Sequence, residues 1–101
     1  MDMYKAPLKE CLSDYVLRFR KEQKLSQEKM AELLRMTPRA YGDLERGKFC
    51  FSTQTMLFFF SLLETEEMVE IMDEFREIVV KAEKVKTQGN EITYESGNRM
   101  V

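Results

Sequence analysis

Two consecutive short segments, each opened by a capping residue, constrain the fold of this chain most strongly. Ser26 precedes the first segment, and its hydroxyl can accept a hydrogen bond from a free amide of the first helical turn. Thr37 does the same for the second segment, where Pro38 takes the first helical position and lacks an N–H that would have no partner there. Gly47 can supply the left-handed conformation that ends a helix. The pattern predicts two short helices joined by a tight turn.

Such a pair is a helix-turn-helix, in which the second helix can lie in the major groove of DNA. Apolar residues recur at spacings of three and four over residues 7–22, which predicts an amphipathic helix before the pair. Ser52 can cap a fourth helix that extends to about Leu63, and Thr65 can cap a fifth that extends to about Lys84. The sequence therefore predicts an all-α fold of five helices.

The segment from about Leu12 to Leu63 resembles the helix-turn-helix domain of the Cro and lambda-repressor-like family, also called the xenobiotic-response-element (XRE) family. The resemblance implies a DNA-binding domain over residues 1–64. The pattern of the remaining sequence predicts a dimerising C-terminal helix over 65–86 and a polar tail over 87–101. It rests on an ordered set of short motifs with family-like spacing: Arg20, Leu25-Ser26-Gln27, Met30-Ala31-Glu32, Leu33-Leu34, Leu44-Glu45-Arg46-Gly47 and Ser52.

Length and composition fit one small domain of 101 residues. No apolar run approaches the roughly 20 residues that span a membrane, and the N-terminus lacks the apolar core of a signal peptide, so we expect a cytoplasmic protein without a membrane partner. The chain has no histidine, no Cys-x-x-Cys and no glycine-rich phosphate loop, which argues against a metal site, a cofactor or an enzyme. Cys11 and Cys50 are expected to be reduced thiols that pack as small hydrophobic residues.

The charge is distributed unevenly along the chain. Residues 1–50 carry eleven Lys and Arg against eight Asp and Glu, whereas residues 51–101 carry five against ten. A basic half that contains the helix-turn-helix favours double-stranded DNA as a partner, although an asymmetry of this size also arises by chance.

The resemblance also implies which residues touch DNA. Arg39 is the strongest candidate for base recognition, because its planar fork matches the two acceptors on the major-groove edge of guanine; the alternative is a solvated arginine. Gln27 would reach a phosphate or support the recognition helix. The other implied base contacts are Thr37, Pro38, Gly42 and Asp43, and the implied phosphate contacts are Lys24, Arg46 and Lys48.

Arg20 and Glu45 have a different expected role. In the family the matching positions form a partly buried ion pair that joins the first helix to the end of the recognition helix. We therefore expect these two residues to be structural and not to contact DNA.

Several positions depart from the family pattern. Arg35 stands in the turn, where glycine is usual and where a positive φ is needed at a cost of about 1 kcal/mol. Asp43 lies four residues after Arg39, so the two can pair on one helix face. Pro38 and Gly42 offer no donor side chain. The recognition surface is thus poor in hydrogen-bond donors.

Phe58, Phe59 and Phe60 are consecutive, and a helix cannot bury three successive side chains on one face. The fifth helix carries apolar residues on more than one face, so it can cover the phenylalanines and contact a partner together. We expect a homodimer assembled through the fourth and fifth helices; the alternative is a monomer in which the fifth helix only covers the phenylalanines. The expected interface residues are Phe58, Met68, Ile71, Met72, Phe75, Ile78 and Val79.

Two functions fit the sequence. The first is a DNA-binding, repressor-like transcriptional regulator that reads operator DNA with the helix from Thr37 to Arg46, acts as a homodimer and has a toxin or regulator as a further possible protein partner. The second is an interaction module that keeps the fold for dimerisation and binds DNA weakly or not at all. The intact helix-turn-helix motif favours the first function, and the donor-poor recognition surface favours the second.

Overall fold

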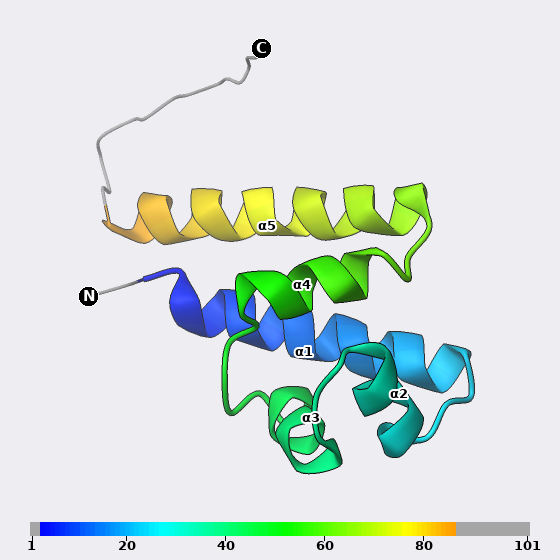
Figure 1. Cartoon of the computed structure of the whole chain (residues 1–101). Coiled ribbons are helices and arrows are strands. Elements are labelled where there is room, and N and C mark those ends of the chain that lie inside the picture. The colour runs from blue at the N-terminus through cyan, green and yellow to red at the C-terminus, as the bar shows by residue number, and fades with distance from the viewer. Residues whose placement is uncertain (1–2, 87–101) are drawn as a thin grey trace.

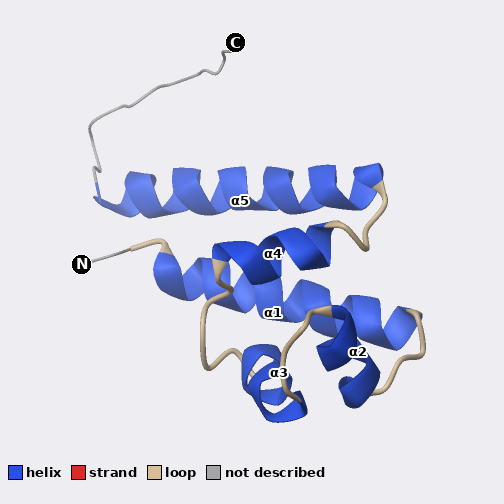
Figure 2. Cartoon of the chain, viewed as in Figure 1, coloured by secondary structure: helices blue, strands red, loops and turns tan. Residues whose placement is uncertain are grey.

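The computed structural model describes residues 3–86, with side chains for residues 3–83, and contains five α-helices and no strand in that part of the chain (Figures 1 and 2). The predicted all-α fold is therefore confirmed. The expected tail over 87–101 lies outside the described residues. None of the helices in residues 3–86 is long and apolar enough to cross a membrane. The helices are α1 (Lys5–Glu22), α2 (Gln27–Leu33), α3 (Pro38–Glu45), α4 (Thr53–Phe60) and α5 (Thr65–Lys86).

Three of the helices begin at the predicted capping residues. The side-chain oxygens of Ser26, Thr37 and Ser52 accept hydrogen bonds from the backbone N–H three residues later, at 3.0, 3.1 and 3.1 Å. Each bond satisfies one amide that has no partner within its own helix. The sequence therefore specifies the starts of α2, α3 and α4 locally.

The start of α5 differs from the prediction, in which Thr65 was the cap. Thr65 is already the first helical residue, and the carbonyl of Glu64 accepts hydrogen bonds from the N–H groups of Glu67 and Met68. The Glu67 carboxylate reaches back and accepts from the Glu64 N–H at 2.9 Å. This backward bond from the third helical residue is half of a capping box, and it places the cap one residue earlier than expected.

Within residues 3–86, three residues adopt the left-handed backbone conformation that ends or turns a helix. Gly47 does so after α3, as predicted, with φ of 77°. Arg35 does so in the turn between α2 and α3, with φ of 59°, and so meets the requirement that glycine usually meets in the family. Lys24, which follows α1, has φ of 58° and was not predicted to be in this region.

The core is built around α1 and Phe59. In Figure 1, α5 runs along one side of α1, while α2 and α3 lie on the other. Phe59 is fully buried in α4, and its ring lies edge-on to Phe19 at 5.9 Å and tilted against Phe51 at 6.0 Å. Phe58 and Phe60 are half-buried and also pack against the core. The chain thus accommodates its three consecutive phenylalanines by burying only the middle one completely.

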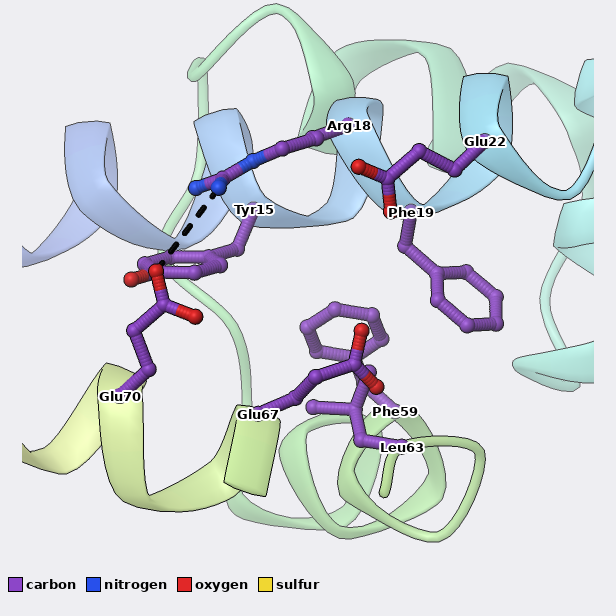
Figure 3. Close-up of a pocket in the computed structure, with 8 residues that line it drawn as sticks. All are labelled: Tyr15, Arg18, Phe19, Glu22, Phe59, Leu63, Glu67 and Glu70. Atoms are coloured by element: carbon purple, nitrogen blue, oxygen red, sulfur yellow. Dashed lines mark ion pairs between the residues drawn. The ribbon is translucent and has the colours of Figure 1, made fainter. Parts of the chain in front are cut away.

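The fifth helix packs on α1 and shares the core of the preceding helices. The Tyr15 hydroxyl donates to the Glu74 carboxylate at 2.7 Å, and the Tyr4 hydroxyl donates to Glu83 at 2.8 Å. Arg18 lies over the Tyr15 ring and approaches Glu70 at 3.9 Å, as the dashed line in Figure 3 shows. These bonds and the ion pair attach α5 to α1 and to the residue that precedes it.

This packing corrects part of the expected dimer interface. Ile71 is only 4% exposed and belongs to the core of the chain itself, so its side chain is not available to a partner. Ile78 and Phe58 also pack against that core. Two of the expected interface residues on α5, Ile71 and Ile78, therefore belong to the face by which α5 binds its own domain.

The two faces of α4 give the first prediction. Phe59→Ala should lower the free energy of unfolding by about 3–5 kcal/mol, because it leaves a cavity among Phe19, Phe51 and Phe60. Leu57→Ala, on the same helix but at a side chain that is 62% exposed, should change it by no more than about 0.5 kcal/mol. Urea denaturation followed by circular dichroism measures both values. Equal losses in the two variants would contradict the assigned orientation of α4.

Candidate nucleic-acid interface

The recognition helix is oriented by the apolar residues on its inner face. Tyr41 is fully buried and Leu44 is 5% exposed, and both pack in one cluster with Met30 and Leu34 from the first half of the motif. The first residues of the helix, 37–40, are exposed on the other side. The geometry therefore presents the N-terminal end of α3 to solvent, as a helix-turn-helix requires for base contact.

An ion pair fixes the C-terminal end of the same helix. The Arg20 Nε donates to Glu45 Oε2 at 2.7 Å, and its Nη2 donates to Glu45 Oε1 at 3.2 Å, so the pair is bidentate. The third nitrogen of Arg20 donates to the Leu25 carbonyl at 3.0 Å. The two side chains are 17% and 8% exposed. The expected pair between α1 and α3 thus forms, and it also holds the loop that leads into α2.

Two further donors complete the environment of Glu45. The Gln27 side-chain amide donates to Oε1 at 2.6 Å, and the Tyr41 hydroxyl donates to Oε2 at 2.5 Å. Of the two roles expected for Gln27, the structure shows the supporting one, since its amide is bonded to the recognition helix. Glu45 therefore links the end of α3 to α1, to the first residue of α2 and to Tyr41 one turn earlier in α3.

These contacts change the titration of the groups involved. Burial alone would raise the pKa of Glu45, but hydrogen bonds from Arg20, Tyr41 and Gln27 outweigh it and lower that pKa below its ordinary value. Burial and the bond to Glu45 raise the pKa of the Tyr41 phenol. The bond to Glu45 raises the pKa of Arg20. Arg20 and Glu45 therefore stay ionised at neutral pH, and Tyr41 stays neutral and donates its hydrogen bond.

The exposed start of α3 contains the best candidate for base recognition. Arg39 is exposed and makes no ion pair or hydrogen bond with the described part of the chain, so its guanidinium is free to bind an external acceptor. Thr37 is exposed too, but its hydroxyl already caps the helix. Ala40 is exposed beside Arg39 and was not predicted as a contact, although a small apolar side chain suits the thymine methyl group. Pro38, between Thr37 and Arg39, has no hydrogen-bond donor to offer to a base.

The negative charge of Asp43 is compensated by ion pairs with basic residues other than Arg39. It forms ion pairs with Arg46 and, at 3.9 Å, with Lys48, and its side chain is 16% exposed. The expected pair with Arg39 does not form, because Arg46 reaches back over the last turn of α3. Gly42 is buried beneath the Arg46 guanidinium, where a Cβ atom would lie 3.3 Å from Nη1. Gly42 therefore provides room for Arg46 and presents no side chain to DNA.

The comparisons with known proteins agree with this geometry. A family model described as helix-turn-helix matches residues 16–66 of the 101-residue chain. The chain is a member of the helix-turn-helix family. No curated protein and no solved structure matches it significantly. The matched helix-turn-helix segment includes α2, α3 and α4 in full, and the family is one of DNA-binding regulators of the XRE and lambda-repressor-like type.

The helix-turn-helix turn carries one residue whose role sequence analysis missed. The Arg35 guanidinium lies over the Phe58 ring at 4.5 Å from its centre, and its Nη1 donates to the Leu33 carbonyl at 2.7 Å. A cation over an aromatic face is attracted by the negative potential of the ring. Arg35 therefore ties the turn to α4, and its arginine side chain covers part of the half-buried Phe58.

A hollow on the α5 side of this helix-turn-helix domain is too small for most ligands. Its lining comes from three helices and the loop after α4 (Figure 3): Tyr15, Arg18, Phe19 and Glu22 of α1, Phe59 of α4, Leu63, and Glu67 and Glu70 of α5. Its volume of about 110 Å³ is below the roughly 300 Å³ of the smallest typical ligand pockets. We therefore read it as a packing gap between α1, α4 and α5.

The lowered pKa of Glu45 gives a prediction about pH. The folded pKa lies below the unfolded one, so the native state binds fewer protons, and the stabilisation is present above the unfolded value of about 4.3. It is lost as the pH falls through the folded pKa. The difference in unfolding free energy between wild type and Glu45→Gln should therefore be largest at neutral pH and shrink below about pH 4.

Urea titrations at several pH values between 7 and 3 measure this difference. Glu10→Gln, which changes an exposed carboxylate on α1, is the matched control and should follow wild type throughout. A difference between wild type and Glu45→Gln that stays constant down to pH 3 would show that the carboxylate charge does not stabilise the helix-turn-helix domain.

Proposed function

We propose that this helix-turn-helix protein is a sequence-specific DNA-binding transcriptional regulator of the repressor kind, which places α3 in the major groove of operator DNA as a homodimer. The observation that carries the proposal is the free, exposed Arg39 on a helix whose other end is fixed by Glu45. A guanidinium can read guanine only if its helix is held in one orientation, because the bidentate contact tolerates little displacement. The Glu45 cluster supplies that rigidity.

Basic residues around α3 support contact with the phosphate backbone. Lys24 precedes α2, and Lys48 and Arg46 follow the last turn of α3, so positive charges lie on both sides of the recognition helix. Phosphate contacts of this kind set the position and orientation of the protein without reading sequence. Two of the three cations are shared with Asp43, which reduces the positive charge available to phosphate.

The proposed dimer follows from the small number of base pairs that one helix-turn-helix domain can contact. One helix-turn-helix reads only a few base pairs, and two copies related by a two-fold axis address half-sites about one helical turn apart. The face of α5 that points away from α1 provides apolar side chains for such an interface. Met72 is 46% exposed, and Val79 is half-buried. We propose Met72 and Val79 as residues of the dimer interface, with the half-buried Met68 and Phe75 at the edge of that interface.

A second candidate function is supported by exposed apolar side chains outside α5. Phe49 and Leu57 are 56% and 62% exposed, in the loop after α3 and on α4. Side chains of this kind suit contact with another protein better than contact with DNA. A protein-interaction module that binds DNA weakly is therefore the alternative, and the experiment below separates the two.

The first test is binding to DNA of random sequence. Fluorescence anisotropy with a labelled random duplex, repeated over a salt series, should show binding that weakens steeply with salt, because each neutralised phosphate releases a counterion. Asp43→Asn should bind more tightly and steepen the slope by up to about 2, since it frees Arg46 and Lys48 for phosphates. Glu77→Gln, which removes a charge on α5, is the control and should change little. Absence of binding at low salt in all three proteins would favour the interaction module.

The second test concerns sequence recognition. After an operator has been selected from a random pool, Arg39→Ala should weaken binding to it by about 1–3 kcal/mol and leave binding to random DNA nearly unchanged. Arg39→Lys keeps the positive charge without the planar fork and should lose most of the same discrimination. Unchanged affinity of Arg39→Ala for the selected operator would remove Arg39 from base recognition.

A further inference from the structure

An apolar stripe on α5 has no cover within the described part of the chain. Val69, Met72 and Val80 are 52%, 46% and 54% exposed, whereas Ile71 on the opposite side is buried. The spacing of Val69, Met72, Arg76 and Val80 is three, four and four residues, so the four lie along one side of the helix. The stripe spans about 16 Å of helix, as expected from about 1.5 Å per residue. It is a second apolar face, separate from the one that binds α1.

The charges of α5 are segregated along its length. Residues 65–75 carry five acidic residues and no basic one, whereas residues 76–86 carry four basic and two acidic residues. Asp73 and Arg76 stand on the two sides of this boundary and form an ion pair at 3.0 Å, with both side chains well exposed. The helix therefore has an acidic first half and a basic second half beside one apolar stripe.

We propose that a second copy of this chain covers the stripe, and that the two α5 helices pair antiparallel with Val69 of one copy opposite Val80 of the other. In this register, Asp73 of each copy lies opposite Arg76 of the other, so the ion pair within each helix becomes a network of four charges across the two-fold axis. The inference rests on the proposed homodimer and adds its orientation and register.

Charge complementarity decides between the two orientations. In an antiparallel pair, the acidic half of each helix lies along the second half of the other, in which four basic residues outnumber two acidic ones, so the net charges of the facing halves attract. A parallel pair would instead place the five acidic residues of residues 65–75 along five identical ones. Like charges in such proximity oppose association. A nucleic acid or an anionic membrane as occupant is disfavoured by the same acidic half.

Disulfide trapping tests orientation and register together. We would prepare Val69→Cys and Val80→Cys separately and oxidise each alone and in an equal mixture. Residues 69 and 80 of one chain are about 16 Å apart, too far for a variant to cross-link with its own copy in the antiparallel register, whereas the mixed pair lies within disulfide range. The cross-linked dimer should therefore form in the mixture and be lost in either single variant. Wild type, which retains Cys11 and Cys50, is the control for background cross-linking.

The outcomes separate this inference from the proposed function. Cross-linking of either variant alone would overturn the antiparallel arrangement. No cross-link in a protein that light scattering shows to be dimeric would overturn α5 as the interface but leave the homodimer. A monomer mass without cross-links would overturn the homodimer as well. DNA binding by anisotropy is measured independently of all three.

A charge exchange tests the register without cysteines. Arg76→Asp places two acidic residues opposite each other in the proposed register and should raise the dimer dissociation constant at least severalfold by analytical ultracentrifugation. The double variant Asp73→Arg, Arg76→Asp restores an opposite-charge pair in every position and should regain most of the wild-type affinity. Both substitutions lie on the exposed face of α5, so the fold is expected to persist, and circular dichroism checks it. An unchanged dissociation constant in Arg76→Asp would overturn the register.

Discussion

The bidentate ion pair between Arg20 and Glu45 is the interaction on which the position of the recognition helix α3 depends. It joins α1 to the last turn of α3, and the same arginine holds the carbonyl of Leu25 in the loop between α1 and α2. Removing one partner from such a pair leaves a charge that has lost most of its water, which typically costs about 3–5 kcal/mol. Gln27 and Tyr41 add donors to the same carboxylate. A short helix of eight residues, which would be marginal alone, is thereby held in one orientation.

Much of this arrangement could be predicted because its causes are local. Ser26, Thr37 and Ser52 cap their helices through bonds to residues three positions away, and Gly47 ends α3 through its own backbone conformation. The ion pair of Arg20 and Glu45 was expected from the family resemblance, since nothing in the sequence alone brings residues 25 positions apart together. Family membership, in turn, was carried by short motifs whose spacing the fold preserves.

The structure differs from the sequence-based predictions at Asp43, at the start of α5 and at Ile71. The sequence allows Asp43 to pair with Arg39 at helical spacing, but Asp43 pairs with Arg46, three residues later at the end of the same helix, and with Lys48 beyond the turn at Gly47. The cap of α5 was assigned to Thr65 because threonine is a common capping residue, whereas the backward bond from Glu67 selects Glu64. The sequence of α5 predicts Ile71 at the interface with a partner, because apolar residues occur on more than one face of this helix and the sequence does not show which face is buried in the same chain. At Asp43 and Glu64 the deciding contacts are local but compete with another local pairing, whereas the burial of Ile71 depends on contacts with distant parts of the chain.

The central helix connects the two surfaces that the proposed function needs. α1 carries Arg20, which fixes the recognition helix, and Tyr15 and Arg18, which attach α5 through Glu74 and Glu70. The exposed stripe of α5 and the exposed start of α3 therefore both belong to helices that pack on α1. In the proposed dimer this fixes the separation of the two recognition helices, and hence the spacing of the half-sites. The buried Ile71 and the bond from Tyr15 to Glu74 therefore contribute more to holding that spacing than the exposed pair of Arg18 and Glu70, since exposed pairs contribute at most about 1 kcal/mol.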